Sequence, residues 1–313
     1  MTEANIPPEW ESALAEFDRD AAAIVAPLTD ELNAKPPPPI IYHYTDGRGL
    51  EGILRSGKFW LTDVFHLNDP SELRHALAHA VQLVNAKAVG GTAEEQLFAK
   101  IFSDVPATGV TASAYYFVCS LSLCGDELGQ WRAYADDGQG FALGFDAAPF
   151  NKWAFGSNSA FPVMYDDSRL AGIQQGLVNR FFPLLRLPGS GYIGTSAGRA
   201  YLTQVSALFT VHILHAASYF KNEAYKTEQE YRLLHLYQFG QKPAHVKYRS
   251  RPYSLVPYTE FDWRQAARQS LRRIVIGPSA RHPIADQFLD DCLKAFHSGQ
   301  VSVQLSKIPY RAL

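Results

Sequence analysis

The chain has 313 residues, of which 47% are hydrophobic, and a formal net charge of -2 at pH 7. This length and apolar content are enough for one large domain or two modest ones with a sizeable core. The near-neutral charge excludes the strong electrostatic footprint of a general nucleic-acid or anionic-membrane binder, while a local basic groove stays possible.

Cysteine usage and the first residues bear on the cellular compartment. Cys119, Cys124 and Cys292 have a spacing that fits neither a zinc site nor a disulfide framework, which indicates a reducing compartment. The opening stretch, MTEANIPPEWE, lacks the basic and apolar regions of a secretory signal, and no run of about eighteen apolar residues occurs. We therefore expect a cytoplasmic protein with no membrane contact.

The first predicted element is an N-terminal helical segment over residues 1–35. Its apolar side chains, among them Trp10, Leu14 and Phe17, recur at steps of three and four residues, which is the period of one helix face. Four prolines at residues 36–39 end this helix and form an extended connector. Residues 40–313 are then expected to form a single domain.

That single domain is predicted to mix strands and helices in an irregular order. It opens with a strand at residues 40–45 and a short helix that ends at Gly57 in a left-handed cap. Asp69, Pro70 and Glu72 have the spacing of a capping box that starts the next helix. Further strands are expected at residues 58–62, 115–122, 141–146, 161–165, 246–253, 273–277 and 301–308, and further helices at residues 127–134, 168–185, 200–222 and 283–297. The predicted fold class is therefore α+β, with helical insertions near residues 69–105 and 168–222.

The stretch KTEQEYRLLHL at residues 226–236 has an unusual arrangement of charge. If it is extended, the two-residue side-chain period places Glu228, Glu230 and Arg232 on one face. The apolar end of the stretch is typical of a buried strand, so two carboxylates would share a small surface at the entrance of that strand. The alternative is a solvated strand end at which Arg232 neutralises Glu230.

Other reactive side chains have simpler explanations. His75 and His79 stand four residues apart on a predicted helix, but no third ligand accompanies them, so we expect no metal site. Cys119 and Cys124 lie in or beside a buried strand, and no nearby histidine is indicated that would activate either thiol. A cysteine hydrolase is therefore not predicted.

Four blocks of sequence, in this order, resemble a bacterial domain-of-unknown-function family, number 2971. The blocks are YHYT at residues 42–45, NDPSE at 68–72, WRAY at 131–134 with GQG at 138–140, and EQEYR at 228–232. The likeness extends over about residues 40–313. It assigns no chemistry by itself.

A more distant resemblance does suggest chemistry. His43-Tyr44-Thr45 resembles the His-Gly-Ser/Thr motif of ADP-ribosyltransferases, which split NAD and transfer its ADP-ribose. FVCS at residues 117–120, followed by WRAY, is similar to the strand and helix that supply a tyrosine to stack on nicotinamide. Glu230 resembles the catalytic glutamate that starts the fifth core strand. The resemblance implies a split core of mixed and antiparallel strands with helical insertions.

The resemblance also implies a role for each residue. Glu230 would stabilise the oxocarbenium-like transition state that forms when the bond between nicotinamide and ribose breaks. Tyr134 would stack on the nicotinamide ring, and His43 would hydrogen-bond a ribose hydroxyl. Thr45 and Ser120 would orient neighbouring polar groups, Arg132 would meet the pyrophosphate, and Glu228 would activate an acceptor.

The implied function is NAD-dependent transfer of ADP-ribose to a macromolecule, a protein more readily than a nucleic acid, in toxin or phage-defence biology. An NAD glycohydrolase of the same fold and an inactive nucleotide- or peptide-binding module are the alternatives. Two departures from the pattern bear on them. Tyr44 replaces the glycine of the motif, so a backbone clamp on nicotinamide requires its side chain to point away. Glu228 and Glu230 resemble the ExE turn of arginine-modifying members, whereas His43 belongs to the other class, so the resemblance does not select an acceptor. The sequence predicts no oligomeric state.

Overall fold

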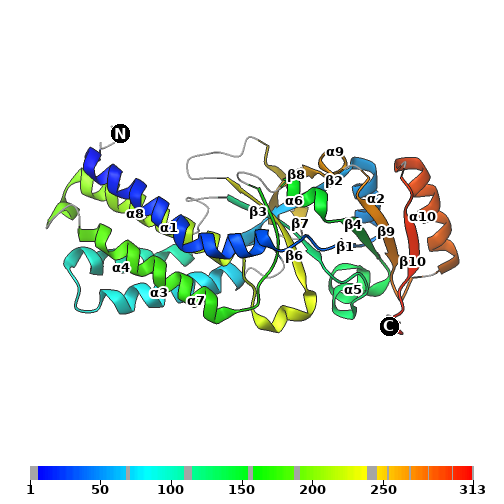
Figure 1. Ribbon diagram of the computed structural model, residues 1–313, viewed down its shortest axis with the longest axis horizontal. Helices are drawn as coiled ribbons and strands as arrows, with labels where there is room; N and C mark the ends of the chain where they lie inside the picture. The colour runs from blue at the N-terminus through cyan, green and yellow to red at the C-terminus, as the bar shows by residue number, and fades with distance from the viewer. Residues whose placement is uncertain are drawn as a thin grey trace.

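The computed structural model describes residues 6–311 with internal gaps. The gaps are residues 68–70, 109–114, 154–157, 187–190, 238–244, 252–253, 268, 281 and 298. A bundle of helices forms one end of the elongated molecule, and a large sheet flanked by further helices forms the remainder (Figure 1). The N-terminus lies at the outer end of the bundle, and the C-terminus lies at the opposite end of the molecule, near β10 (Figure 1).

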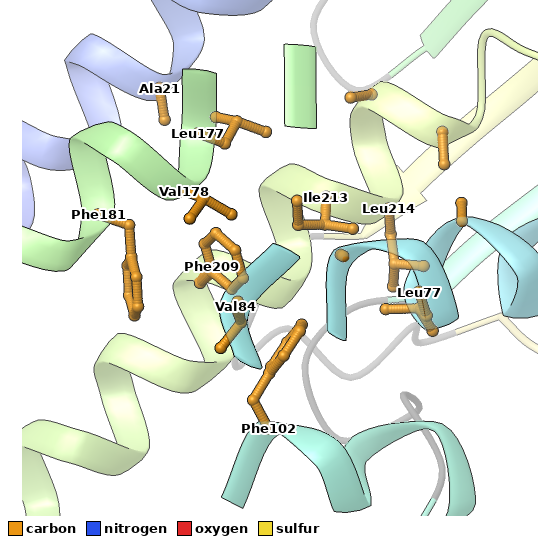
Figure 2. Close-up of a cluster of buried hydrophobic side chains, with 14 of the residues drawn as sticks. Ala21, Leu77, Val84, Phe102, Leu177, Val178, Phe181, Phe209, Ile213 and Leu214 are labelled. Carbon is orange, nitrogen blue, oxygen red and sulfur yellow. The ribbon is translucent and has the colours of Figure 1, made fainter. Parts of the chain in front are cut away.

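The bundle joins segments that are far apart in the sequence. Its helices are α1 (Pro8–Ala34), α3 (Ser71–Ala88), α4 (Ala93–Thr108), α7 (Asp167–Phe181) and α8 (Ser196–Ala217). Apolar faces of these helices meet in a common core, to which Ala21, Val84, Phe102, Phe181 and Phe209 contribute (Figure 2). The N-terminal helix and both predicted insertions thus bury their apolar stripes against one another.

Within the described residues, ten strands form one sheet with the order β10-β9-β4-β1-β3-β2-β8-β7, and β6 and β5 lie off this path. The strands are β1 (Ile40–Thr45), β2 (Lys58–Asp63), β3 (Tyr115–Ser122), β4 (Phe141–Asp146), β5 (Asn158–Pro162), β6 (Glu230–Tyr237), β7 (Lys247–Arg251), β8 (Ser254–Asp262), β9 (Leu271–Ile276) and β10 (Ser302–Leu305). Neighbours are antiparallel except β9 and β10, which are parallel. This mixed sheet with its separate helical layer confirms the predicted α+β class.

The sheet branches at β3. Strand β6 pairs with β3 along its whole length, from Tyr115 to Ser122. The other edge of β3 is shared, because β2 pairs with it at Phe117 and Val118 while β1 pairs with it at Ser122. One arm continues through β4, β9 and β10, and the other through β8 and β7. Residues 119–121 of β3 lie between the two arms.

Most elements with strong local signals occur where they were predicted. Strands β1, β3 and β4 have the expected bounds, and α2 (Gly47–Ser56) ends at Gly57 with φ of 69° and a bond from its N–H to the Ile53 carbonyl. Helix α5 (Leu128–Tyr134), helix α10 (His282–Phe296) and strands β9 and β10 also lie within a few residues of prediction. The capping residues Asp69 and Pro70 and the Glu72 side chain lie outside the described residues.

The structure differs from the predictions in three places. Helix α6 (Ala148–Trp153) was not predicted. A hairpin of β7 and β8 replaces the single strand expected at residues 246–253. Pro257 interrupts the strand signal of β8, and it lies just outside the stretch Tyr258–Asp262 that pairs with β2, where a proline is tolerated. Glu228 is not in a strand: it ends a 3₁₀ helix, η6 (Glu223–Glu228), and Gln229 turns the chain at φ of 44° before β6 begins.

Among the described residues, no helix combines the length and apolar character needed to cross a membrane.

Candidate functional site

A cavity of about 910 Å³ opens where the sheet branches. Small-molecule sites commonly measure about 300–1,000 Å³, so the cavity is large enough for a nucleotide-sized ligand. Its walls come from β1, β2, β3, α2, α5 and the start of β6. Six predicted site residues line it, namely His43, Thr45, Ser120, Tyr134, Glu228 and Glu230.

Glu230 lies at the start of β6 with only 3% of its surface exposed. Its Oε1 accepts hydrogen bonds from Ser120 Oγ at 2.8 Å and from Arg232 Nε at 2.8 Å. Burial alone would raise the pKa of Glu230, but the charges of Arg232 and Lys221 and these hydrogen bonds lower it to about 2. The carboxylate is therefore ionised at neutral pH. Arg232 pairs with Glu230, as the alternative expected, but both side chains are buried, so this strand end is not solvated.

Lys221 completes the charge cluster, and the sequence analysis missed it. Its Nζ donates to Glu230 Oε2 at 3.0 Å and to Glu228 Oε2 at 2.6 Å. Glu228 and Glu230 lie close together, as predicted. A turn of the chain brings both side chains to one cation, whereas the prediction relied on strand alternation. No local pattern marks Lys221, because it lies in the short segment between α8 and η6.

His43 faces the cavity from β1. Its ring packs against Phe59, with 5.3 Å between ring centroids, and its Nδ1 lies 3.9 Å from Cys119 Sγ. Burial lowers the pKa of His43 to about 4 despite a hydrogen bond with the backbone of Ser120, so the ring is neutral at pH 7.

The expectation that no histidine lies near Cys119 is wrong, because β1 and β3 meet at the branch of the sheet. The thiol is nevertheless not activated. Burial raises the pKa of Cys119 to about 12, and the neutral His43 supplies no charge that would favour a thiolate.

The Tyr44 side chain points toward α5, away from the face of β1 that carries His43. Its hydroxyl donates to the Cys124 carbonyl at 2.9 Å and accepts from the Glu127 N–H at 3.1 Å. Its ring meets the edge of Trp131, with 4.8 Å between centroids. Tyr44 is also among the residues that line the cavity, with its hydroxyl and ring held at α5 and the segment before it.

The two predicted residues of α5 lie differently. Tyr134, the last residue of the helix, lines the cavity and is 38% exposed. Arg132 is not among the described residues that line the cavity; its side chain is 63% exposed and lies 3.9 Å from Asp137. Other basic side chains line the cavity instead, including Arg48 on α2 and Arg249 on β7. Arg249 donates to Thr62 Oγ1 at 3.0 Å and lies over the Trp60 ring.

Helix α2 closes one side of the cavity by approaching β1 at Gly49. A Cβ atom on Gly49 would lie 1.9 Å from Thr45 Oγ1, whereas a Cβ atom on Gly52 of the same helix would meet nothing within 4 Å. We expect Gly49→Ala to lower the free energy of unfolding by about 1–3 kcal/mol, because Thr45 or the helix must move. Gly52→Ala is the matched control and should raise it by about 0.5–1 kcal/mol. Urea unfolding of both variants measures this difference, and equal effects would contradict the close approach.

The histidines considered as metal ligands have other environments. His79 Nδ1 lies 2.5 Å from Gln174 Oε1, a contact between α3 and α7 inside the bundle. His75 is exposed on α3. No group of three or more His, Cys, Asp or Glu side chains in the described part of the chain is arranged to hold a metal ion.

Residues 130–233 match the model of a family described as a protein of unknown function, DUF2971. This similarity supports the resemblance noted from the sequence, over a shorter range than 40–313. The matched range runs from α5 to β6 and contains Tyr134, Glu228 and Glu230, whereas His43 and Ser120 precede it. Searches of curated proteins and of solved structures give no significant match.

Proposed function

We propose that this protein is an NAD-dependent ADP-ribosyltransferase whose active site is the cavity at the branch of the sheet. The observation that carries the proposal is the Glu230 carboxylate. It is ionised, it accepts a hydrogen bond from Ser120, and it lines the same cavity as His43 and Tyr134. A branched sheet with a cavity between its arms also agrees with the split core that the distant resemblance implies.

The chemistry requires negative charge beside the ribose of NAD. When the bond between C1′ and the nicotinamide nitrogen breaks, positive charge develops on the sugar, and the fixed Glu230 carboxylate would stabilise it. Because the pKa of Glu230 is held at about 2, this charge is available throughout the physiological pH range. The neutral His43 would hydrogen-bond a ribose hydroxyl, and Thr45 would orient it.

The remaining roles follow from the cavity lining. The exposed Tyr134 ring would stack on nicotinamide, which contributes ~1 kcal/mol by analogy with aromatic pairs. With the Tyr44 side chain held at α5, the β1 backbone could clamp the carboxamide. The pyrophosphate partner is better assigned to Arg249 or Arg48 than to Arg132, because the first two line the cavity. Glu228 would accept the proton of the acceptor.

A catalytically inactive binding module is the second candidate, and one observation favours it. Both oxygens of Glu230 already accept bonds from cations, Arg232 and Lys221, and a fully paired buried cluster can be purely structural. An NAD glycohydrolase with water as acceptor uses the same residues as the transferase. The near-neutral net charge favours a protein over a nucleic acid as macromolecular acceptor. The cytoplasmic location and the role in toxin or phage-defence biology are parts of the same proposal.

The test is nicotinamide release from NAD by the purified protein, with and without cell extract. We expect release together with ADP-ribose bound covalently to a macromolecule. Release accompanied only by free ADP-ribose would identify a glycohydrolase. Arg132→Gln is the control, since this exposed residue lies outside the cavity lining and its replacement should leave release unchanged. Absence of release in every extract, together with no NAD binding by calorimetry, would contradict the enzyme proposal.

A further inference from the structure

Lys221 occupies the space between the two carboxylates of the cavity. Its Nζ lies 2.6 Å from Glu228 Oε2 and 3.0 Å from Glu230 Oε2. In the proposed reaction, Glu228 faces the acceptor and Glu230 faces the ribose. The Lys221 ammonium group therefore occupies the position that a positively charged acceptor would need in order to contact both carboxylates.

Lys221 is held in this place by its own backbone and by an aromatic ring. Its N–H donates to the Met164 carbonyl at 2.9 Å, next to an isolated bridge between Met164 and Phe220. Its Nζ lies 4.9 Å from the centroid of the Tyr225 ring, a cation–π contact. With a side chain only 7% exposed, Lys221 is part of the cavity wall and is not a loose surface lysine.

Among the residues that the structure describes, the cluster holds as many carboxylates as cations. Two carboxylates, Glu228 and Glu230, face two cations, and the second cation, Arg232, also donates to the Ser218 carbonyl at 2.8 Å. A guanidinium or ammonium acceptor would add a third cation to side chains that are at most 19% exposed. Lys221 and Arg232 would both repel a further cation in this poorly solvated place, whereas a neutral nucleophile brings no charge.

We infer that Lys221 is a specificity-determining residue that limits the acceptor to a neutral oxygen nucleophile, water or a hydroxyl group. This inference rests on the proposed function. The acceptor oxygen forms a bond to C1′ of the ribose and gives its proton to the Glu228 carboxylate. The bond between C1′ and the nicotinamide nitrogen breaks, and its electron pair leaves with neutral nicotinamide.

The first test measures binding and does not depend on activity. Agmatine, a small guanidinium compound, is titrated by calorimetry into the wild-type protein, Lys221→Met and Lys221→Gln. We expect agmatine to bind either variant at least about tenfold more tightly than it binds the wild type, because the carboxylates lose a competing cation. The double variant Lys221→Met/Glu228→Gln should lose this gain. Lys221→Gln is included because its amide group can still donate hydrogen bonds to the carboxylates without a charge. Circular dichroism establishes which variants fold.

Two results would overturn the inference. One is agmatine binding to the wild type that Glu228→Gln removes, a result that needs no Lys221 variant. The other is a folded Lys221→Met or Lys221→Gln protein that gains no agmatine affinity. A second arm adds NAD and looks for an ADP-ribose–agmatine adduct, which we expect with Lys221→Met and not with the wild type. If the wild type does not release nicotinamide, the proposed function fails, while the calorimetry still decides whether Lys221 excludes a cation.

Discussion

Glu230→Gln is expected to lower the free energy of unfolding by about 3–5 kcal/mol, because it removes the charge of a carboxylate that two buried cations share. Arg232 Nε and Lys221 Nζ both donate to Glu230, and all three side chains are at most 7% exposed. In the proposed reaction the same change removes the charge that faces the ribose, so nicotinamide release should fall about 100- to 1,000-fold. Denaturant unfolding and a nicotinamide assay at a temperature where the variant is folded measure the two effects.

Glu260→Gln is the matched control. Glu260 also lines the cavity and also pairs with two cations, Lys58 at 2.7 Å and Lys247 at 2.8 Å, but its side chain is 21% exposed. This partly solvated cluster should contribute about 1 kcal/mol or less to the free energy of unfolding. Its loss should leave the rate of nicotinamide release within a few-fold of the wild-type rate. Equal destabilisation by the two changes would contradict the assignment of Glu230 to a dry charge cluster. Normal release by a folded Glu230→Gln protein would remove its catalytic role.

Acidification should destabilise the protein between pH 6.5 and about 4 through His43. Burial lowers the pKa of this histidine from 6.5 to about 4 in the folded state. As the pH falls, the unfolded chain therefore binds the proton first, so the stability that is complete above pH 6.5 is lost progressively toward pH 4. A pKa shift of this size corresponds to a loss of at most about 3 kcal/mol in the free energy of unfolding, and partial exposure of the His43 ring at the cavity makes the loss smaller.

The measurement is the free energy of unfolding from pH 7.5 to pH 4.5 for the wild type and for His43→Gln. The variant removes one proton-binding group, so its stability should fall less steeply over this range. His215, which burial also shifts to a pKa of about 4, lies on α8 in the bundle and contributes equally to both proteins. Parallel pH profiles for the two proteins would show that His43 is readily protonated in the folded state.

Sequence reasoning succeeded where the signal is local. The apolar period of α1, the aromatic and β-branched run of β3 and the left-handed cap at Gly57 each depend on neighbouring residues, and each element has the expected place. It failed where a residue departs from its usual preference. Gln229 adopts a positive φ that its side chain disfavours, and Pro257 lies inside a strand, so neither the turn before β6 nor strand β8 was predicted.

The candidate site was predicted in part. Strand alternation and resemblance selected His43, Ser120 and Glu230, which line one cavity. Arg132 was selected through the resemblance of the WRAY block, and the helix turns it toward Asp137 and solvent. Lys221 and Arg249 were missed, because no local sequence pattern predicts what a lysine or arginine in a loop or edge strand will contact.

The sequence by itself determined that the chain is an α+β protein, where most of its helices and strands lie, and that Glu230 lies at the charged end of a buried strand. These properties depend on side-chain periodicity and backbone preference, which act over a few residues. Only the tertiary structure decided that β1 and β2 share one edge of β3, which creates the cavity, and that α8 ends beside β6, which brings Lys221 between Glu228 and Glu230. The physical reason is that these positions depend on the burial of separate apolar surfaces against one another, and the charge balance of the site depends in turn on those positions.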